Sequence, residues 1–499
     1  MDNPVLWALI GLQVVMGAFD TLFHHEGTER LAWRPSQRQE LRLHGVRNFF
    51  YMIIFIFIFI FICFAWTEPR GVFTMILATI LVVEVLITLW DFVEEDLTRR
   101  LPATERVTHT LLALNYGAIL ALAAPHLIAW AQMDSAIIPT HYGWWSIFAT
   151  LSAVGVGLFS ARDLLAANRS DRLARPDPAL LLPDLPAGQR VLITGGTGFI
   201  GTRLVAALVA GGHDVTVLTR RKDSADHLAH PIRSITDLRQ IPDTAQFDSI
   251  INLAGDAVAG GLWTKAKRGR IIGSRVDVTE QIIALIDRLH LKPQSLINGS
   301  AIGWYGLRDD TMLDETAAST DCFTHHVCAA WEKAADAASD RGLRVVKLRI
   351  GLVLGVEGGM LGKLLTPFEF GLGGRMGDGR QWMSWIDLDD MVRLIGFVMA
   401  HDIDGPINAT APNPVTNADL TIALANALGR PAWLRFPGWL LRFALGDLAH
   451  ETMLSGQRII PAKAQDAGFT FWHSDLNSAL RKMTGARATD IRALRRRLS

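Results

Sequence analysis

The sequence predicts an all-α domain of about five membrane-crossing helices, followed by an α/β domain with a doubly wound parallel sheet and a small C-terminal α+β region. Three observations support this fold class. Long apolar runs fill the chain before residue 165, a glycine-rich turn directly follows an apolar strand at residues 191–194, and strands then alternate with helices. The 499 residues suit two or three domains.

The apolar runs lie at residues 5–23, 49–66, 72–90, 111–133 and 144–160. Each is close to the ~20 residues that cross the hydrocarbon core as a helix, so we expect a lipid bilayer as partner. The first run contains Gln13 and Asp20. It has no basic segment before it and no small-residue cleavage site, so we do not interpret it as a signal peptide.

Arginines orient the predicted helices. They cluster in the loops on one side, at residues 30–47, 99–106 and 162–175, whereas Arg70 stands alone on the other side. The positive-inside rule then places the N-terminus outside a bacterial-type inner (cytoplasmic) membrane and everything after residue 161 in the cytoplasm. The formal net charge of zero gives no electrostatic argument for nucleic acid as a partner. Three scattered cysteines fit a reducing compartment.

A G-x-x-G-x-x-G motif formed by Gly195, Gly198 and Gly201 separates the strand at 191–194 from a helix. In this setting the glycines let the backbone approach a pyrophosphate at the helix N-terminus, which is typical of a Rossmann-type fold. A tight glycine turn without a ligand is the alternative. The predicted cofactor-binding residues of this turn are Thr194, Gly195, Gly196, Thr197, Gly198, Phe199, Ile200 and Gly201.

The second strand of this domain ends in Arg220 and Arg221. An NAD site usually has an acid here for the ribose 2′-hydroxyl, whereas arginines suit a 2′-phosphate, so we expect NADP(H). Two solvated arginines are the alternative interpretation. We expect a transmembrane domain at 1–165, a linker at 166–188, the NADP-binding domain at 189–410 and a C-terminal substrate region at 411–499.

Several motifs resemble those of the extended short-chain dehydrogenase/reductases, in the epimerase/dehydratase branch: TGGTGFIG, INLAG and SAIGWYG. Longer segments, among them WEKAAD and NATAPNPVTNADL, are similar to one atypical subfamily. The segment LSGQRIIPAKAQDAGFTF resembles the small domain of unknown function that closes those proteins. The resemblance covers about residues 189–483 and implies an NADP-binding fold with a C-terminal substrate region.

The resemblance also assigns positions. It places Arg220 at the 2′-phosphate, Ala254 and Gly255 beside the adenosine half of the cofactor, and the catalytic Ser/Thr of the superfamily at Ser300 or Ala301. The positions of the usual Tyr and Lys hold Cys328 and Glu332. A Lys normally lowers the pKa of the Tyr and holds the ribose; Glu332 can only accept hydrogen bonds from ribose hydroxyls.

Cys328 and Glu332 are four residues apart and share a helix face. Cys328 could act as a proton donor or a nucleophile, or be an inert small side chain in the core. Tyr305 offers a phenol near the end of the preceding strand and is the other candidate donor, with loop packing as its alternative. His325 and His326 could pair with a thiolate or simply be solvated.

A glycine-rich segment at residues 371–387 carries Arg375, Arg380 and Gln381, which could close over a substrate and hold an anionic group. An ordinary surface connection is the alternative. Arg275 is a further candidate for contact with a small-molecule substrate.

Acidic residues and histidines recur near the ends of the predicted membrane helices on the arginine-rich side. Asp20 and His24 are four apart, as are Glu40 and His44, and Asp91, Glu95 and His109 follow on later helices. Carboxylates and imidazoles from several helices of a bundle can build a two-metal site. The alternative is that they are acidic partners of the arginines and helix caps.

The leading functional prediction is a membrane-anchored NADP(H)-dependent oxidoreductase or epimerase. Its substrate would be small or membrane-derived, such as a lipid or quinone. One alternative is a non-catalytic NADPH sensor coupled to the membrane domain. Another is a membrane metalloenzyme fed by NADPH. A homo-oligomeric state stays open.

Overall fold

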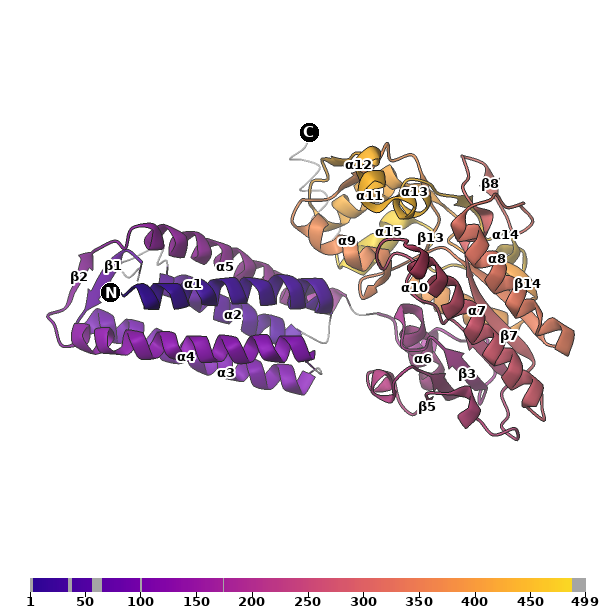
Figure 1. Cartoon of the computed structure of the whole chain (residues 1–499), viewed down its shortest axis with the longest axis horizontal. Helices are drawn as coiled ribbons and strands as arrows, with labels where there is room; N and C mark the ends of the chain where they lie inside the picture. The colour runs from indigo at the N-terminus through magenta and orange to yellow at the C-terminus, as the bar shows by residue number, and fades with distance from the viewer. Residues whose placement is uncertain (1–2, 35–37, 56–64, 99–100, 174, 487–499) are drawn as a thin grey trace. The chain divides into compact units, whose positions relative to one another are not determined.

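The computed structural model describes residues 3–34, 38–55, 65–98, 101–173 and 175–486. The chain forms two compact units, Met1–Ala174 and Arg175–Ser499. The first unit is helical, and the second is built on a seven-stranded sheet (Figure 1).

Five α-helices in the described part of the first unit run alongside one another (Figure 1). They are α1 (Pro4–Phe19), α2 (Arg38–Phe55), α3 (Val72–Thr98), α4 (Ala103–Ala131) and α5 (Trp144–Arg169). A π-helix, Asp20–Glu29, continues directly from α1. The short strands β1 (Thr67–Arg70) and β2 (Ala136–Pro139) pair antiparallel at the end of the bundle where α1 begins.

Four segments of this unit are long and apolar enough to cross a membrane: Pro4–Trp33, Val72–Leu97, Ala103–Ala131 and Trp144–Arg169. The second predicted run, 49–66, includes residues 56–64, which lie outside the described residues. The count of five spans therefore stays a prediction.

Small residues let α2 and α5 approach closely. A Cβ atom on Gly45 would lie 2.7 Å from Leu164 Cγ, and one on Gly157 would lie 2.5 Å from Met52 Sδ. The hydroxyl of Ser160 donates to the carbonyl of Gly45 at 2.7 Å. Small residues of this kind let two helices associate through close van der Waals packing and interhelical hydrogen bonds, without a hydrophobic driving force.

The seven strands of the second unit are all parallel, in the order β14–β9–β7–β6–β3–β4–β5. Their bounds are β3 (Arg190–Thr194), β4 (Asp214–Leu218), β5 (Arg233–Ile235), β6 (Ser249–Asn252), β7 (Ser295–Ala301), β9 (Arg344–Ile350) and β14 (Gly405–Ala409). Since β3 lies between β4 and β6, the chain reverses its direction across the sheet there. In such sheets the ligand crevice forms beyond the carboxyl ends of the strands at that switch point.

Side chains alternate between two helical layers. Val191 and Ile193 of β3 point toward α6 (Phe199–Ala210) and α10 (Leu388–Ala400). Leu192 points the other way, toward α7 (Lys265–Arg288) and α8 (Phe323–Asp336). Because strands that are buried on both faces have no polar side, they appear in sequence as continuous apolar runs.

Residues 175–185, expected to be linker, contact the α/β fold. Leu181, Leu182 and Leu185 are buried in the core beneath α6 and α10. A Cβ atom on Gly396 of α10 would lie only 2.3 Å from Leu182 Cδ2. The guanidinium of Arg175 binds Glu357 at 2.6 Å.

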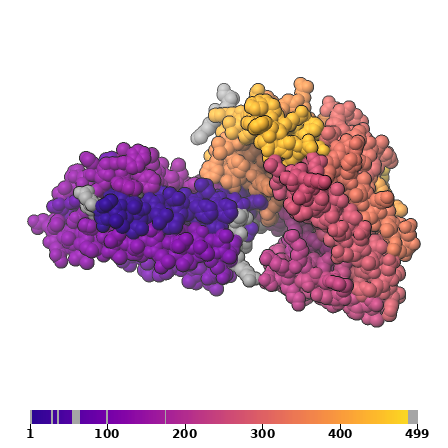
Figure 2. Space-filling view, in the orientation of Figure 1, coloured from indigo at the N-terminus to yellow at the C-terminus, as the bar shows by residue number. Residues whose placement is uncertain are grey.

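The C-terminal region contains α11 (Asn417–Leu428), α12 (Gly438–Leu445), α13 (Asp447–Thr452), α14 (Ala462–Asp466) and α15 (Leu476–Thr484). Short strands tie it to earlier segments: β8 (Met312–Leu313) pairs with β17 (Arg458–Ile459), β11 (Gly374–Met376) with β16 (Leu434–Phe436), and β12 (Trp382–Met383) with β15 (Val415–Thr416). The remaining pair, β10 (Leu352–Gly355) and β13 (Trp385–Asp387), flanks α9 (Gly359–Glu369) in sequence. In the second unit the yellow C-terminal segments lie directly on the orange ones (Figure 2).

Candidate functional site

The turn between β3 and α6 requires glycine for two separate reasons. Gly195 has a φ of +72°, and a Cβ atom there would lie 2.6 Å from the carbonyl carbon of Leu253. A Cβ atom on Gly201 would lie 2.2 Å from the carbonyl oxygen of Gly195. The first glycine allows the left-handed turn, and the second lets α6 pack against it.

The N-terminus of α6 is open to an anion. Gly198 is its N-cap residue, and among the described residues no side chain caps this end of the helix. Its first N–H groups carry the positive end of the helix dipole, which suits a diphosphate. Thr194 and Phe199 act differently: the Thr194 hydroxyl donates to Asn252 Oδ1 at 2.6 Å, and the Phe199 ring packs against Gly355 and its neighbours.

Arg220 and Arg221 follow the neighbouring strand. Thr194 of β3 is paired with Leu218 of β4, so the two arginines begin just beyond the glycine turn. Both side chains are exposed. Two exposed guanidinium groups at this edge fit the 2′-phosphate of NADP(H).

On the other side of the switch point, β6 leads into Ala254 and Gly255. A Cβ atom on Gly255 would lie 2.9 Å from the guanidinium carbon of Arg275. Arg275 donates from Nη1 to the carbonyls of Asp256 (3.1 Å) and Ile271 (2.8 Å). Arg275 therefore ties the segment after β6 to the first turns of α7.

Glu332 of α8 lies in a buried ion pair. Its Oε1 accepts hydrogen bonds from Ser300 Oγ at 2.7 Å and from Arg349 Nε at 3.0 Å, and its Oε2 accepts from Arg349 Nη2 at 3.1 Å. Arg349 lies on β9, directly beside Ser300 of β7. The position that usually holds a Lys next to the ribose thus holds a carboxylate neutralised by an arginine.

Tyr305 belongs to the same network. Its hydroxyl donates to Asn408 Oδ1 at 2.7 Å and accepts from Arg349 Nη1 at 3.2 Å. The side chain is fully buried, and burial raises the pKa of its phenol. The guanidinium of Arg349 also stacks 3.5 Å from the centre of the Trp304 ring. Arg349 and Asn408 are members of this network that the sequence motifs did not indicate.

Burial raises the pKa of the Cys328 thiol to about 12, although hydrogen bonds with Ala301 and Ser300 act in the opposite direction. At neutral pH the group is therefore a thiol, which can donate a proton but is a poor nucleophile. His325 Nδ1 contacts the carbonyl of Trp304 at 2.6 Å. His326 pairs with Asp321 at 2.6 Å on the surface.

Trp331, three residues after Cys328 on α8, offers a hydrogen-bond donor. The indole Nε1 of Trp331 is buried and has no hydrogen-bond partner in the part of the chain that the structure describes. A Cβ atom on Gly299 would lie 2.6 Å from the Trp331 ring, so the glycine makes room for it at the carboxyl end of β7.

The glycine-rich segment is held by Gln381. Its amide Nε2 donates to the carbonyls of Met376 at 3.1 Å and Met453 at 2.7 Å, which fastens the segment to the C-terminal region. Arg380 is exposed and Arg375 is half-buried. Of the three substrate candidates here, Arg380 is the one that points freely into solvent.

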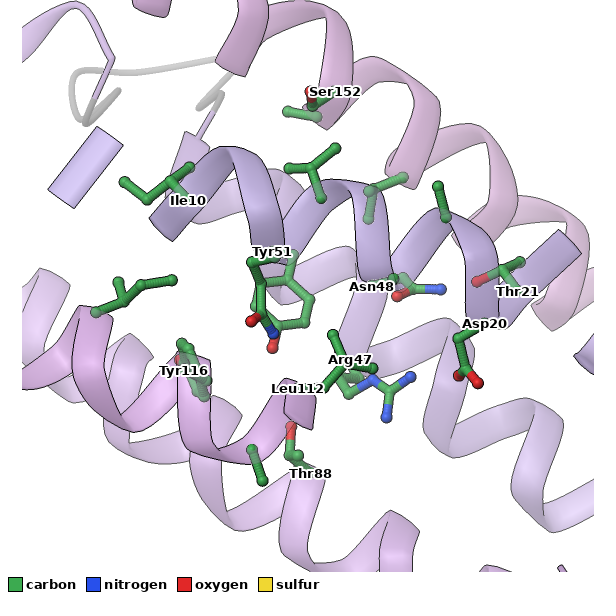
Figure 3. Close-up of a pocket in the computed structure, with 18 of the residues that line it drawn as sticks. Ile10, Asp20, Thr21, Arg47, Asn48, Tyr51, Thr88, Leu112, Tyr116 and Ser152 are labelled. Carbon is green, nitrogen blue, oxygen red and sulfur yellow. The ribbon is translucent and has the colours of Figure 1, made fainter. Parts of the chain in front are cut away.

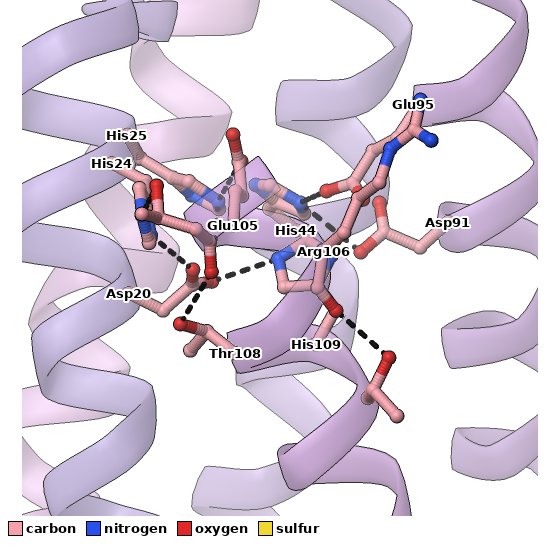
Figure 4. A network of polar contacts seen from close by, with 12 residues as sticks. Asp20, His24, His25, His44, Asp91, Glu95, Glu105, Arg106, Thr108 and His109 are labelled. Carbon is pink, nitrogen blue, oxygen red and sulfur yellow. Dashed lines mark hydrogen bonds and ion pairs between the residues drawn. The ribbon is translucent and has the colours of Figure 1, made fainter. Parts of the chain in front are cut away.

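The residues predicted to bind metal are all buried: Asp20, His24, Glu40, His44, Asp91, Glu95 and His109. Most of them converge in the first unit (Figure 4). The structure groups four potential ligands, Asp20, His25, Glu105 and His109, and separately groups His25, His44 and Glu95. His25 and Glu105 were not among the residues expected from the sequence.

Residues 191–409 match the NAD dependent epimerase/dehydratase family, and residues 436–483 match a domain of unknown function, DUF1731. An epimerase family protein of Mycobacterium bovis is 39% identical over 293 residues, which cover 58% of this chain and 96% of that protein. The chain belongs to the NAD-dependent epimerase/dehydratase family. Both matched regions lie in the second unit.

Two further similarities narrow the family to its atypical extended branch. A chloroplastic homolog of SDR39U1 from Arabidopsis thaliana is 36% identical over 299 residues, 58% of this chain and 85% of that protein. The crystal structure of human epimerase family protein SDR39U1 (isoform 2) with NADPH is 29% identical with a TM-score of 0.53, covering 59% of this chain and 99% of that chain. A nicotinamide cofactor is the group that this family's fold accommodates.

Proposed function

We propose that the chain is a membrane-anchored NADP(H)-dependent oxidoreductase or epimerase. The observation that carries this proposal is the uncapped N-terminus of α6, reached through Gly195 and Gly201 and flanked by Arg220 and Arg221. Its backbone N–H groups would hold the diphosphate, and the arginines the 2′-phosphate. When bound, NADPH supplies hydride for reduction of a carbonyl-type carbon.

The contacts of the side chains near the predicted nicotinamide position limit which of them can donate a proton in the reaction. The Tyr305 hydroxyl is committed to Asn408 and Arg349, and Glu332 is neutralised by Arg349. Cys328 keeps its proton at neutral pH, because burial raises its pKa to about 12. Since Tyr305 and Glu332 are engaged with other groups, we propose the Cys328 thiol beside Ser300 as the proton donor.

The first unit would serve as the anchor in a bacterial-type inner membrane, with the N-terminus outside and the second unit in the cytoplasm. Four segments long enough to span a bilayer support the anchor, whereas the orientation depends on a fifth span at the predicted run 49–66 and on the arginine-rich loops. Leu114, Leu151 and Leu158 are 68%, 65% and 68% exposed on α4 and α5, as side chains facing lipid would be. Alkaline phosphatase fused after residue 174 should be inactive in cells and a fluorescent protein there should be bright; the reverse would contradict this orientation.

A lipid-like or quinone-like substrate is supported by the surface of the C-terminal region. Trp433, Trp439 and Phe443 are 83%, 70% and 87% exposed, and Arg435 and Arg442 lie among them in sequence. Aromatic side chains mixed with arginines are typical of surfaces that contact a membrane interface.

The cofactor preference has a direct test. Replacing Arg220 and Arg221 by glutamate should weaken NADPH binding by at least about tenfold, with little change in NADH binding. The matched control is Arg233→Gln, an exposed arginine on the next strand, β5, which should change neither affinity. An equal loss for both cofactors would contradict the assignment of these arginines to the 2′-phosphate.

A non-catalytic NADPH sensor is the second candidate function. The closed network of Ser300, Glu332 and Arg349 favours it, because these groups already satisfy one another. Substrate-dependent NADPH oxidation across lipid and quinone panels separates the two. Cys328→Ser should abolish that turnover and keep NADPH binding if the chain is an enzyme. A wild-type protein that binds NADPH and shows no turnover on any panel would favour the sensor.

A further inference from the structure

The first unit collects imidazoles and carboxylates from four helical segments in one buried place (Figure 4). The π-helix provides Asp20 and His25, α2 provides His44, α3 provides Asp91 and Glu95, and α4 provides Glu105 and His109. Each of these side chains is at most 8% exposed. Ionisable groups are costly to bury, so such a concentration calls for a specific compensating interaction.

Two distances in the first group are longer than ordinary hydrogen bonds, whereas the third, between His109 and Asp20, is a hydrogen bond. His25 Nε2 lies 3.4 Å from Asp20 Oδ2 and 3.6 Å from Glu105 Oε1. It has no hydrogen-bond partner among the described residues. Ligand atoms bound to one ion by bonds of about 2.0–2.2 Å are separated by roughly 2.9–3.6 Å. His109 Nε2, 3.1 Å from Asp20 Oδ2, completes this set.

In the second group, one imidazole nitrogen of His44 faces the carboxylates of both Asp91 and Glu95. His44 Nε2 lies 3.1 Å from Asp91 Oδ2 and also 3.1 Å from Glu95 Oε1. One ring nitrogen carries at most one proton, so it cannot donate fully to two carboxylates. The other oxygen of Asp91, Oδ1, is buried with no hydrogen-bond partner among the described residues. Arg47 Nη1 already binds Asp91 Oδ2 at 2.5 Å, so a metal ion at this point would bind Asp91 through Oδ1, together with His44 and Glu95.

Hydrogen bonds from neighbouring side chains fix the orientation of the proposed metal ligands Asp20 and His109. His24 Nδ1 lies 2.9 Å from Asp20 Oδ1, with its Nε2 3.2 Å from Thr104 Oγ1. His109 Nδ1 lies 3.2 Å from Glu95 Oε2, which joins the two groups. Metal-bound imidazoles usually direct their other nitrogen to a carboxylate or carbonyl in this way.

We propose that the first unit binds two adjacent first-row divalent metal ions. Asp20, His25, Glu105 and His109 hold one ion, and His44, Asp91 and Glu95 hold the other. Mixed imidazole and carboxylate ligands suit iron, manganese or zinc. Because His25 also belongs to the group around His44, the two ions would be neighbours.

An apolar cavity of about 400 Å³ adjoins this centre (Figure 3). Asp20, Arg47 and His109 line one part of it, while Leu6, Ile10 and other apolar side chains of α1, α3 and α4 line much of the rest. The ligand that fits is a molecule with a long apolar chain and one polar end that reaches the metal ions.

Metal content of the full chain tests the centre. Protein purified in detergent, stripped with chelator and titrated anaerobically with Fe²⁺, Mn²⁺ or Co²⁺ should bind about two ions per chain. His44→Gln and His109→Gln should each lose at least one ion. The control is His126→Gln. His126 lies on the same helix as His109 and belongs to neither metal group. Far-UV circular dichroism and gel filtration of each variant in detergent check that the helical unit has folded, because NADPH binding reports only on the other unit.

Two outcomes would overturn the centre: less than one ion per chain with every metal, or unchanged stoichiometry in both histidine variants. A single ion would overturn the dinuclear assignment. His24→Gln should weaken metal affinity by about 10- to 100-fold and leave the stoichiometry intact, because His24 only orients Asp20.

The visible spectrum of the Co²⁺-loaded protein tests the cavity. A twelve-carbon alcohol should shift the Co²⁺ bands of the wild type. Gly17 lines the cavity, and a Cβ atom there would have nothing within 4 Å, so Gly17→Leu should fill it. This variant should keep its metal and lose the alcohol effect. An identical shift in both proteins would overturn the assignment of the ligand to this cavity.

Discussion

Two of the buried polar clusters in the described residues differ in how well their hydrogen-bond donors and acceptors match. In the second unit, Glu332 meets a guanidinium and a hydroxyl, so its carboxylate oxygens are matched by donors from Arg349 and Ser300. In the first unit, His25 Nε2 faces two carboxylates at distances of 3.4 and 3.6 Å without a hydrogen bond. Burial alone does not distinguish these clusters.

The difference shows what to look for in a buried polar cluster. A set whose donors and acceptors match one another can stabilise a fold without any ligand. A set whose nitrogen and oxygen atoms face one another at distances longer than hydrogen bonds can also bind a cation. The two clusters should therefore respond differently to substitution and to added metal.

The largest effect is expected from Arg349→Met. Removing the guanidinium leaves Glu332 buried beside Ser300 alone, which should lower the free energy of unfolding by about 3–5 kcal/mol. Chemical denaturation of the full chain, followed through loss of NADPH binding, measures it. The control is Arg341→Met, which breaks the exposed pair with Asp287 and should leave the free energy of unfolding nearly unchanged. Equal losses would mean that the buried pair has no special role.

Cys328 should be protected by the same burial. With its pKa raised to about 12, its thiolate fraction at neutral pH should be roughly a thousandfold below that of the unfolded chain, where the thiol pKa is about 8.5. Folding favours the protonated thiol, so its stabilising contribution is complete below about pH 8.5 and disappears as the pH rises toward about 12. Alkylation with iodoacetamide, resolved by mass spectrometry, should label the half-buried Cys322 first. Equally fast labelling of both cysteines would show that burial does not protect Cys328.

A bound metal ion should stabilise the helical unit and leave the stability of the second unit unchanged. An ion added at about 100 times its Kd should raise the free energy of unfolding of the helical unit by about 2.7 kcal/mol. The second unit, monitored by NADPH binding, should unfold at the same denaturant concentration with or without the ion. Stabilisation of both units to the same extent would indicate a nonspecific effect of the ion.

The smallest effect concerns the glycine turn. Gly201→Ala places a Cβ atom against the Gly195 carbonyl, so NADPH affinity should fall by about tenfold, or about 1.4 kcal/mol. Gly269→Ala in α7 is the control, because a Cβ atom there would have nothing within 4 Å. Fluorescence titration with NADPH compares them, and unchanged affinity in the Gly201 variant would argue against tight packing at the turn.

The fold of the second unit could be predicted because its signals are local. The glycine turn, the apolar strands and their alternation with helices are all visible within short stretches of sequence. The partner of Glu332 could not be predicted, because it depends on which strands become neighbours. Arg349 is placed beside Ser300 by the register of β7 and β9. It is one of three basic residues in β9, with Arg344 and Lys347, so the sequence of the strand does not single it out.

The metal-binding prediction missed His25 for a different reason. On an α-helix, Asp20 shares a face with His24, four residues on, and His25 points elsewhere. The chain here forms a π-helix, in which hydrogen bonds connect residues five apart, so His25 also reaches Asp20. Glu105 could have been found, since it lies four residues before His109 on α4 and shares its face.

The π-helix Asp20–Glu29 has a consequence at the level of the gene. A π-turn is equivalent to an α-helix that has gained one residue, so everything after it is rotated relative to an uninterrupted helix. Deleting a single codon between Asp20 and His24 would restore α-helical winding and carry His25 to the fourth position after Asp20. The pairing of Asp20 with two consecutive histidines therefore depends on the length of this segment as much as on its side chains.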